Sequence, residues 1–214
     1  KSILLILGKG RENYEIINLF FKGGPVMFIL LSLSILSLTI ILVKSFQFSK
    51  SRIRNSHFLE PIYKLINKKN PSKAIEILSQ KSHPAAKIVM TILDNPNNTA
   101  EDNENEITRV GEIEIRKLEY LLKPLEVIAN LSPLLGLLGT VMGMIKAFSK
   151  LESVGSKVDP AILAGGIWEA LLTTAFGLIV AIPALAAFYW LDGRVDQVRE
   201  DMRHAAIKTI KLLK

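Results

Sequence analysis

The sequence contains no cysteine, so disulfide bonds and thiolate metal sites are excluded. It also has no Gly-x-x-x-x-Gly-Lys-Ser/Thr loop, the motif that cradles nucleotide phosphates, so ATP hydrolysis is not the expected energy source. Its three histidines, His57, His83 and His204, lack metal-ligand spacing, and no Ser/His/Asp grouping falls on one face. We therefore expect no catalytic residue, no metal and no cofactor, and an enzyme is the least favoured class.

Three long stretches lack charged residues altogether. They are Gly23 to Val43, Val127 to Ile145 and Ala170 to Leu191, with 21, 19 and 22 residues. About 18 or more uncharged, mainly apolar residues are enough to span a bilayer as a helix. The sequence predicts an all-α integral membrane protein with three transmembrane helices.

The basic residues of the net +7 charge are distributed unevenly around these spans. Thirteen lysines and arginines flank the spans in the middle segment and the tail, against six near the N-terminus and between spans two and three. The positive-inside rule then places the N-terminus outside and the middle segment and C-terminus in the cytoplasm. Nucleic acid is not an expected partner, because no basic stripe with interleaved aromatic residues is present.

These signals divide the chain into seven segments. They are an outer N-terminal segment that can form a short surface helix (1–22), span one (23–46), a cytoplasmic helical domain (47–124), span two (125–148), a short outer connection (149–160), span three (161–191) and a cytoplasmic C-terminal helix (192–214).

The cytoplasmic segment predicts short helices followed by a long one. Helices are expected to begin near Asn70-Pro71 and near Pro84, and the second is expected to end at 95–98. From Ile107 the apolar periodicity continues without a loop signal, so one helix is predicted from 107 to 148, bent at Pro124 or Pro133.

Spans two and three are expected to extend as helices into the cytoplasm and form a stalk. Lys44, at the inner end of span one, is expected to extend its ammonium group to the membrane interface.

Small residues form a stripe along each of the last two spans. Such spacing lets helix backbones approach closely in lipid, and simple helix packing is the favoured interpretation of the glycines. The packing residues are Gly136, Gly139 and Gly143 in span two, and Gly177 and Ala181 in span three.

Glu169 is the single carboxylate in an otherwise uncharged segment from Ala161 to Leu191. An ionisable group at membrane depth is costly and tends to face a bundle interior or watery cavity. Thr173 lies one turn away and Thr174 lies on the small-residue stripe, so the three side chains predict a route for protons. The alternative is an interfacial glutamate at the outer end of a 22-residue helix. Pro183 is expected to kink the inner half of this span.

Two segments carry a family resemblance. Leu131 to Phe148, with the core Gly-Leu-Leu-Gly-Thr-Val-Met-Gly, resembles the second-span signature of the ExbB, TolQ and MotA proton-channel family. Ile162 to Ala184, with the core Trp-Glu-Ala-Leu-Leu-Thr-Thr-Ala, resembles its third-span signature. Three spans favour the ExbB or TolQ branch, because the MotA branch typically has four.

The resemblance implies a pentameric proton channel in the bacterial inner membrane. Its pore would enclose the single transmembrane helices of an ExbD- or TolR-like partner, and proton flow would drive movement passed to TonB or TolA. The family's pore threonine falls on Thr140, and its third-span glutamate and threonine fall on Glu169 and Thr174. Trp168 departs from the small polar residue often found there. A TolQ-type role in envelope integrity and a purely structural scaffold are the alternatives.

Overall fold

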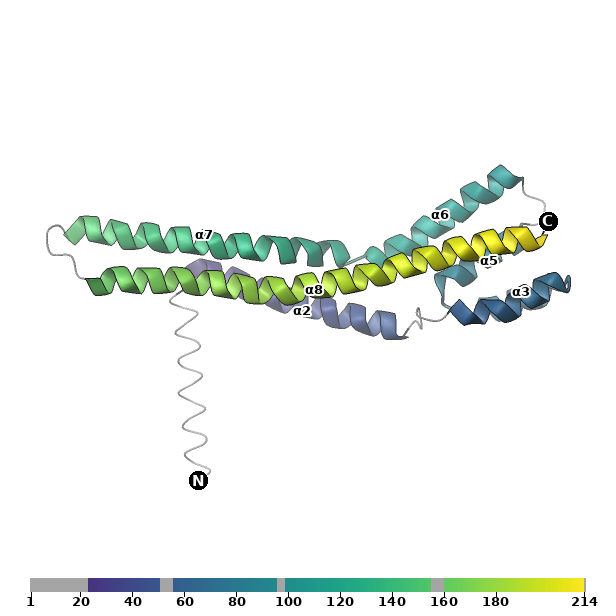
Figure 1. The fold of residues 1–214 in the computed structure, drawn as a ribbon, viewed down its shortest axis with the longest axis horizontal. Coiled ribbons are helices and arrows are strands. Elements are labelled where there is room, and N and C mark those ends of the chain that lie inside the picture. Colours follow the sequence, from purple (N-terminus) through teal and green to yellow (C-terminus); the bar gives the residue numbers. More distant parts are fainter. Residues whose placement is uncertain (1–22, 51–55, 96–98, 155–159, 214) are drawn as a thin grey trace, which may run out of the picture. The chain divides into compact units, whose positions relative to one another are not determined.

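The computed structural model describes residues 23–50, 56–95, 99–154 and 160–213, which form helices joined by short turns (Figure 1). Within these ranges no β-strand occurs, which confirms the predicted all-α class. Three helical stretches are long and apolar enough to cross a membrane, as expected: Gly24–Ser49, Leu122–Glu152 and Leu163–Leu213. The predicted outer segment 1–22 lies outside the described residues, as do 155–159 of the predicted connection.

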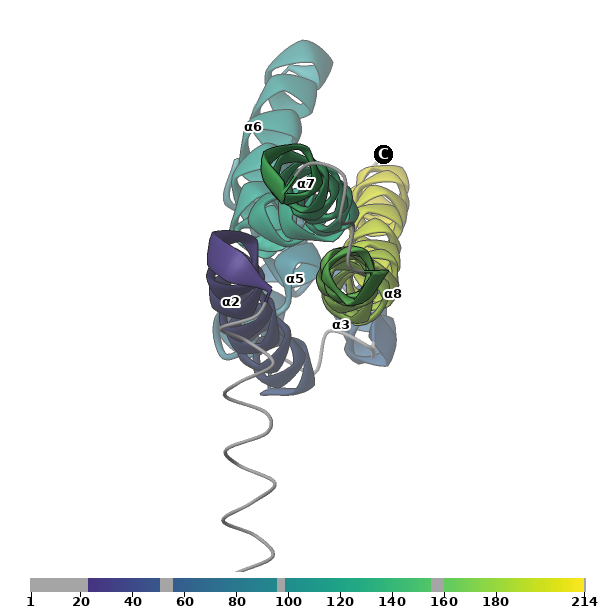
Figure 2. The same cartoon turned by 90° about the vertical axis from the view of Figure 1, so that its left-hand side faces the viewer.

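The chain divides into two compact units, the first comprising residues up to Ile41 and Pro124–Ala187. Parts of α2 (Gly24–Lys50), α7 (Leu122–Val154) and α8 (Pro160–Leu213) make up its described portion. In this unit α7 and α8 lie side by side in both views (Figures 1 and 2). They run antiparallel, because Gly143 faces Ala170 while Gly136 faces Gly177.

One face of α2 is buried in the first unit, and the other faces are open. Met27 and Leu30 are fully buried, and Ile40 is nearly so, whereas Ile35 and Leu38 are more than half exposed. A helix that is apolar on all sides but packs on one side suits a membrane, because lipid can cover the remaining surface.

Both prolines predicted as kinks lie inside continuous helices. Pro133 lies within α7 and Pro183 within α8. A kink at either residue stays a prediction.

The second unit comprises Leu42–Lys123 and Phe188–Lys214. Its short helices pack in sequence, α3 on α4, α4 on α5, and α5 on α6. They follow a 3₁₀ turn at Ser56–Phe58. Their bounds are α3, Leu59–Asn67; α4, Pro71–Ser79; α5, Pro84–Asp94; and α6, Ala100–Glu119.

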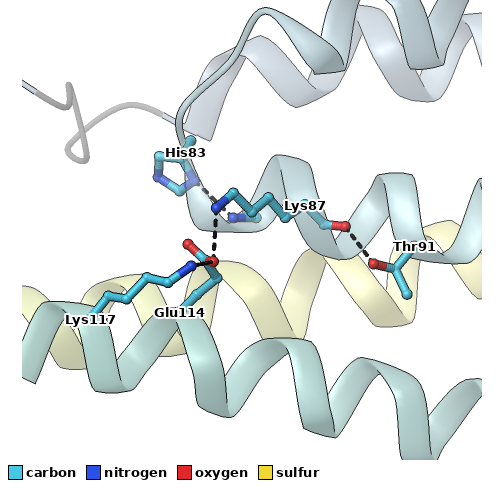
Figure 3. A network of polar contacts seen from close by, with 6 residues as sticks. His83, Lys87, Thr91, Glu114 and Lys117 are labelled. Carbon is cyan, nitrogen blue, oxygen red and sulfur yellow. Dashed lines mark hydrogen bonds and ion pairs between the residues drawn. The ribbon is translucent and has the colours of Figure 1, made fainter.

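Local sequence signals determine where these helices begin. The predicted starts are confirmed, since α4 and α5 each have proline as the first helical residue. The Asn70 side chain accepts a hydrogen bond from the Lys73 amide, and His83 Nδ1 accepts one from the Ala85 amide (Figure 3). Thr99 caps α6 in the same way through the Asp102 amide.

The core of the second unit is built from one face of each helix, at intervals of three or four residues. Its fully buried apolar side chains are Ile62, Ala74, Leu78, Ala85, Ala86, Ile88, Val89, Ile92, Leu122, Leu191, Val195, Val198 and Ala205.

The prediction of one helix from 107 to 148 is wrong. Tyr120 and Leu121 separate α6 from α7, and Leu121 adopts a left-handed backbone conformation with φ of 72°. The physical cause is Pro124. In a continuous helix its ring would clash with the Tyr120 carbonyl, and the hydrogen bond to that carbonyl would have no donor.

Lys44 is also placed differently from the prediction. Its side chain is 1% exposed, and its ammonium group donates to the Leu118 carbonyl at 2.8 Å and to the Gln47 side chain at 3.1 Å. The Leu118 carbonyl is available because it lies in the last turn of α6, where no following helical amide reaches it. Lys44 therefore caps the end of α6 instead of extending to the interface.

Candidate functional site

Glycines bring α7 and α8 of the first unit into backbone contact. A Cβ atom on Gly136 would lie 3.0 Å from the Thr173 carbonyl oxygen and from the Thr174 Cα. A Cβ atom on Gly177 would lie 2.6 Å from the Ser132 carbonyl oxygen. A larger side chain at either position would require the two backbones to shift, so the small-residue stripes determine how closely the two helices approach.

The two threonines of α8 lie beside the same carbonyl of α7. Thr174 Oγ1 donates to the Gly136 carbonyl at 3.1 Å, and Thr173 Oγ1 lies 3.4 Å from it. The Thr173 hydroxyl proton is donated to the Ala170 carbonyl of its own helix at 2.7 Å, and Thr173 is 1% exposed. Thr173 thus occupies a packing position in the single subunit, whereas Thr174 stays half-buried at the edge of the contact.

Glu169 lies at the junction of all three long helices in the first unit. Its Oε1 is 3.5 Å from Lys146 Nζ on α7, and its side chain is 24% exposed. A Cβ atom on Gly24, the first residue of α2, would lie 3.9 Å from the same oxygen. The N-terminal end of α2 and the Lys146 ammonium thus both lie beside this carboxylate.

One end of each of the three uncharged runs lies close to Glu169. Lys146 follows the run in α7, Glu169 precedes the run in α8, and Gly24 is the second residue of the run in α2. Runs of 19 to 22 residues span about 29 to 33 Å, close to the hydrocarbon thickness of a bilayer. The carboxylate therefore lies at one end of this apolar layer and not at its centre.

A cavity of about 340 Å³ opens beside Glu169. Its wall combines three charged side chains with small residues that leave space, and Trp168 closes part of it. The lining residues are Gly143, Lys146, Ala147, Lys150, Ala161, Gly165, Gly166, Trp168 and Glu169. A cavity of this size holds several water molecules, which is what a protonatable carboxylate needs for exchange.

Thr140 lies on α7 away from this cavity. Its hydroxyl donates to the Leu137 carbonyl at 2.6 Å, and it lines a shallow groove of about 580 Å³ with residues up to Glu152. The structure thus brings Glu169, Thr173 and Thr174 to the α7–α8 contact but leaves Thr140 at its edge.

A second polar cluster lies in the second unit, where Lys87 and Lys117 both contact Glu114 (Figure 3). Their ammonium groups lie 2.8 and 2.6 Å from Glu114 Oε1, and Glu114 is 7% exposed. Burial acts to raise the pKa of Glu114, but the two hydrogen bonds and charges together hold it below its ordinary value. The cluster joins α5 to α6.

Within the described ranges, no group of three or more His, Asp or Glu side chains is arranged to hold a metal ion.

The sequence pattern of the MotA/TolQ/ExbB proton channel family matches residues 80–204, more than half of the chain. The chain belongs to this family. The matched region contains α5 to α7 and most of α8, and therefore the whole Glu169 site except Gly24.

Among curated relatives of this proton channel family, the chain is similar to a putative biopolymer transport protein, an ExbB homolog, from Methanothermobacter thermautotrophicus. The two are 29% identical over 85% of this chain and 64% of the relative's length. It is similar to the putative biopolymer transport protein ExbB-like 1 of Synechocystis, at 35% identity over 83% of this chain and 70% of the relative. The Tol-Pal system protein TolQ of Haemophilus influenzae is 41% identical over 41% of this chain and 38% of its own length.

These results confirm the recognised family and its ExbB/TolQ branch, and the chain is a multi-pass membrane protein of a transport family.

Sequence reasoning missed Lys146 as a partner of Glu169. The signal was present: aligning the two small-residue stripes antiparallel, with Gly136 against Gly177 and Gly143 against Ala170, brings Lys146 close to Glu169. The approach of Gly24 had no comparable signal, because the packing of α2 depends on contacts with two helices far along the chain.

Proposed function

We propose that this chain is the proton-conducting subunit of an ExbB/TolQ-type motor that uses the proton motive force. Several copies, five by family resemblance, would surround the single transmembrane helices of an ExbD- or TolR-like partner. The N-terminus would lie outside and the C-terminus in the cytoplasm, as the distribution of basic residues predicts.

The observation that carries the proposal is the Glu169 carboxylate in its setting. It lies within a membrane-spanning helix, is part-buried, and opens onto a cavity large enough for water. Such a group can bind and release protons. Each proton that crosses the membrane down the electrical potential releases about 2.3 kcal/mol of free energy per 100 mV. Thr174 lies on the same helix with exposed area left for a neighbouring subunit or partner.

We further propose that the motor energises TonB-dependent transport across the outer membrane. The relatives that align over most of this chain are putative ExbB homologues, whereas an ExbB and a TolQ relative align over 39% and 41% of it. The long alignments with putative ExbB homologues support the ExbB-type role, and a TolQ-type role in envelope integrity is the alternative.

A second candidate, a structural scaffold with an interfacial Glu169, is favoured by one observation. The three uncharged runs end level with the carboxylate, as they would if Glu169 lay at the membrane surface. A measurement of proton flux distinguishes the two candidate functions, because a structural scaffold conducts no protons.

The test is proton uptake into liposomes that contain this chain and a single-span ExbD/TolR-type partner, driven by a potassium diffusion potential. Glu169→Gln and Thr174→Val are expected to assemble normally and to lose most of the flux. Glu126→Gln is the matched control, because Glu126 is an exposed carboxylate elsewhere on α7. Wild-type flux in both test variants would overturn the proposal.

A further inference from the structure

We infer that a groove in the second unit binds the cytoplasmic segment of the single-span partner. The inference rests on the proposed function, which brings such a partner to this chain, and it adds a contact outside the membrane. The segment that fits the groove is acidic and carries apolar side chains at helical spacing.

The groove lies between α6 and α8, which diverge on one side of an ion pair (Figure 1). At the closed end, Arg199 on α8 lies 2.9 Å from Glu119 on α6. Beyond this pair the two helices separate, and Ile88 of α5 contributes to the lining. The groove has a volume of about 650 Å³, which is within the range of protein binding pockets.

The floor of the groove is apolar. Ile115 and Met202 form part of it, at 8% and 5% exposed, and Ile207 on the wall is 57% exposed. Gly111 leaves the groove open, because a Cβ atom there would have Ile88 Cδ1 as its one neighbour within 4 Å, at 3.9 Å. A partner that inserts apolar side chains here removes this surface from water.

The rim of the groove is basic. Arg116, Arg199 and Arg203 lie along it, against two carboxylates, Glu112 and Glu119. Arg203 forms no ion pair with a carboxylate of the described residues, and the pair of Arg116 with Glu112 is exposed and 3.4 Å long. Acidic side chains of a bound segment would complement this rim.

The charge of the second unit argues against another copy of this chain as the occupant. The unit contains 20 lysines and arginines and 14 aspartates and glutamates, which gives a net charge of +6. Two such units repel each other, whereas an acidic segment is attracted. The chain's own acidic run, residues 101–106, contains no apolar side chain that could fill the floor.

The position of the groove along α8 argues against the membrane surface as the occupant. The uncharged run of α8 ends at Leu191, and Arg199 and Ile207 follow eight and sixteen residues later. At 1.5 Å per residue they lie about 12 and 24 Å further along the helix. The headgroup region on each side of a bilayer is about 5 to 8 Å thick, so the groove lies beyond it.

The single-span partner brings a segment to the same side of the membrane. A helix that crosses the bilayer once has residues on both sides, and the second unit lies on the side predicted to be cytoplasmic. Enclosure of the partner's helix tethers its cytoplasmic segment to the complex. Tethering raises the local concentration of the segment, so a groove of modest affinity is enough to hold it.

The experiment is photo-cross-linking in the liposomes that contain this chain and the partner. The photoreactive residue p-benzoyl-phenylalanine replaces Ile207 on the groove wall. In a second protein it replaces Ile113, which is 40% exposed on α6 but does not line the groove. Mass spectrometry of the cross-linked peptides identifies the residues that are captured.

Two substitutions test the groove in the protein that carries the photoreactive residue at position 207. Arg203→Glu reverses a rim charge, and Gly111→Leu fills the groove. Lys73→Glu, at an exposed lysine of α4, is the control matched in charge. Gly193→Leu is the control matched in size, because a Cβ atom at this exposed glycine of α8 has no heavy atom within 4 Å.

Position 207 is expected to cross-link to the partner's residues on the cytoplasmic side of its span, within an acidic stretch, and position 113 is not. Arg203→Glu and Gly111→Leu are expected to lower the yield about tenfold, as loss of a charge-assisted contact does. Lys73→Glu and Gly193→Leu should leave the yield unchanged. Arg203→Lys, which keeps the charge, should retain most of it.

The inference is overturned if position 207 cross-links to a second copy of the chain, to lipid alone, to the outer part of the partner or to nothing. Equal yields in the test variants and their controls would also overturn it. The proposed function fails separately, when Glu169→Gln conducts protons like wild type. Loss of flux in Glu169→Gln without a cross-link from position 207 to the partner rejects binding in the groove alone.

Discussion

Glu114 shows how single buried charges are stabilised in the second unit. Its carboxylate receives hydrogen bonds from Lys87 on α5 and from Lys117 on α6, so a buried negative charge is balanced by two half-exposed positive ones. The pKa of Glu114 is lowered, because these two partners together outweigh the effect of burial. A lowered pKa means that the folded state prefers the ionised form.

This gives a prediction for pH dependence. A carboxyl group with a lowered pKa in the folded state stabilises the fold above its ordinary value of 4.5, and this contribution is lost as the pH falls through the folded-state pKa. Glu114→Gln should cost about 1–2 kcal/mol at pH 7, a modest amount because both lysines are near solvent. Thermal unfolding in detergent between pH 7 and pH 3 measures it.

The two proteins should approach the same stability at the acid end of this range. Glu112→Gln, an exposed neighbour on α6, is the control and should change the unfolding temperature little. A constant difference between wild type and Glu114→Gln at every pH would contradict the assignment.

At the scale of elements, the close packing of α7 against α8 in the first unit depends on glycines, which have no side chain. Gly177→Ala places a methyl group against the Ser132 carbonyl oxygen, so we expect it to destabilise the helix pair by about 1–3 kcal/mol. Gly165→Ala on the same helix is the control, because no heavy atom lies within 4 Å of a Cβ atom built there. Unfolding in detergent should show a lower stability for Gly177→Ala than for Gly165→Ala. Equal stability of the two variants would contradict the close contact.

The elements themselves were largely predictable, because each has a local signal. Proline at the first position and a capping side chain before it mark α4 and α5, and uncharged runs mark the three long helices. The break at Leu121 was not predicted, because the apolar periodicity continues across it. The signal was Pro124, whose missing amide affects a residue four positions earlier.

The candidate site was predicted less completely. Glu169 stands out in any reading of the sequence, because it is the one carboxylate in its segment. Lys146 and Gly24 do not stand out in the sequence as neighbours of Glu169, because the register in which the helices pack brings them close to it. Sequence patterns specify which face packs, and side-chain contacts across the interface determine the register.

For the whole molecule, the predicted orientation in the membrane can be tested because the chain contains no cysteine. Ser149→Cys, near the outer end of α7, should react with a membrane-impermeant maleimide added to spheroplasts. Ser79→Cys, in the last turn of α4, should react only after the membrane is opened. The measurement is the mass shift of the purified protein.

The unmodified chain is the control for background labelling, and both variants should be labelled after solubilisation in detergent. If Ser79→Cys reacts in sealed spheroplasts while Ser149→Cys is protected, the orientation of the chain in the membrane is the opposite of the predicted one.

The Gly136 carbonyl, which accepts the Thr174 hydroxyl of the neighbouring helix, gives α7 a vibrational reporter. The hydrogen bond from Thr174 should lower the stretching frequency of the Gly136 carbonyl relative to carbonyls that accept only the backbone amide of their own helix. Isotopic labelling of Gly136 would isolate its infrared band from the rest. A shift of that band to higher frequency during proton flow would show that the hydrogen bond between α8 and α7 weakens, and an unchanged band would show that it persists.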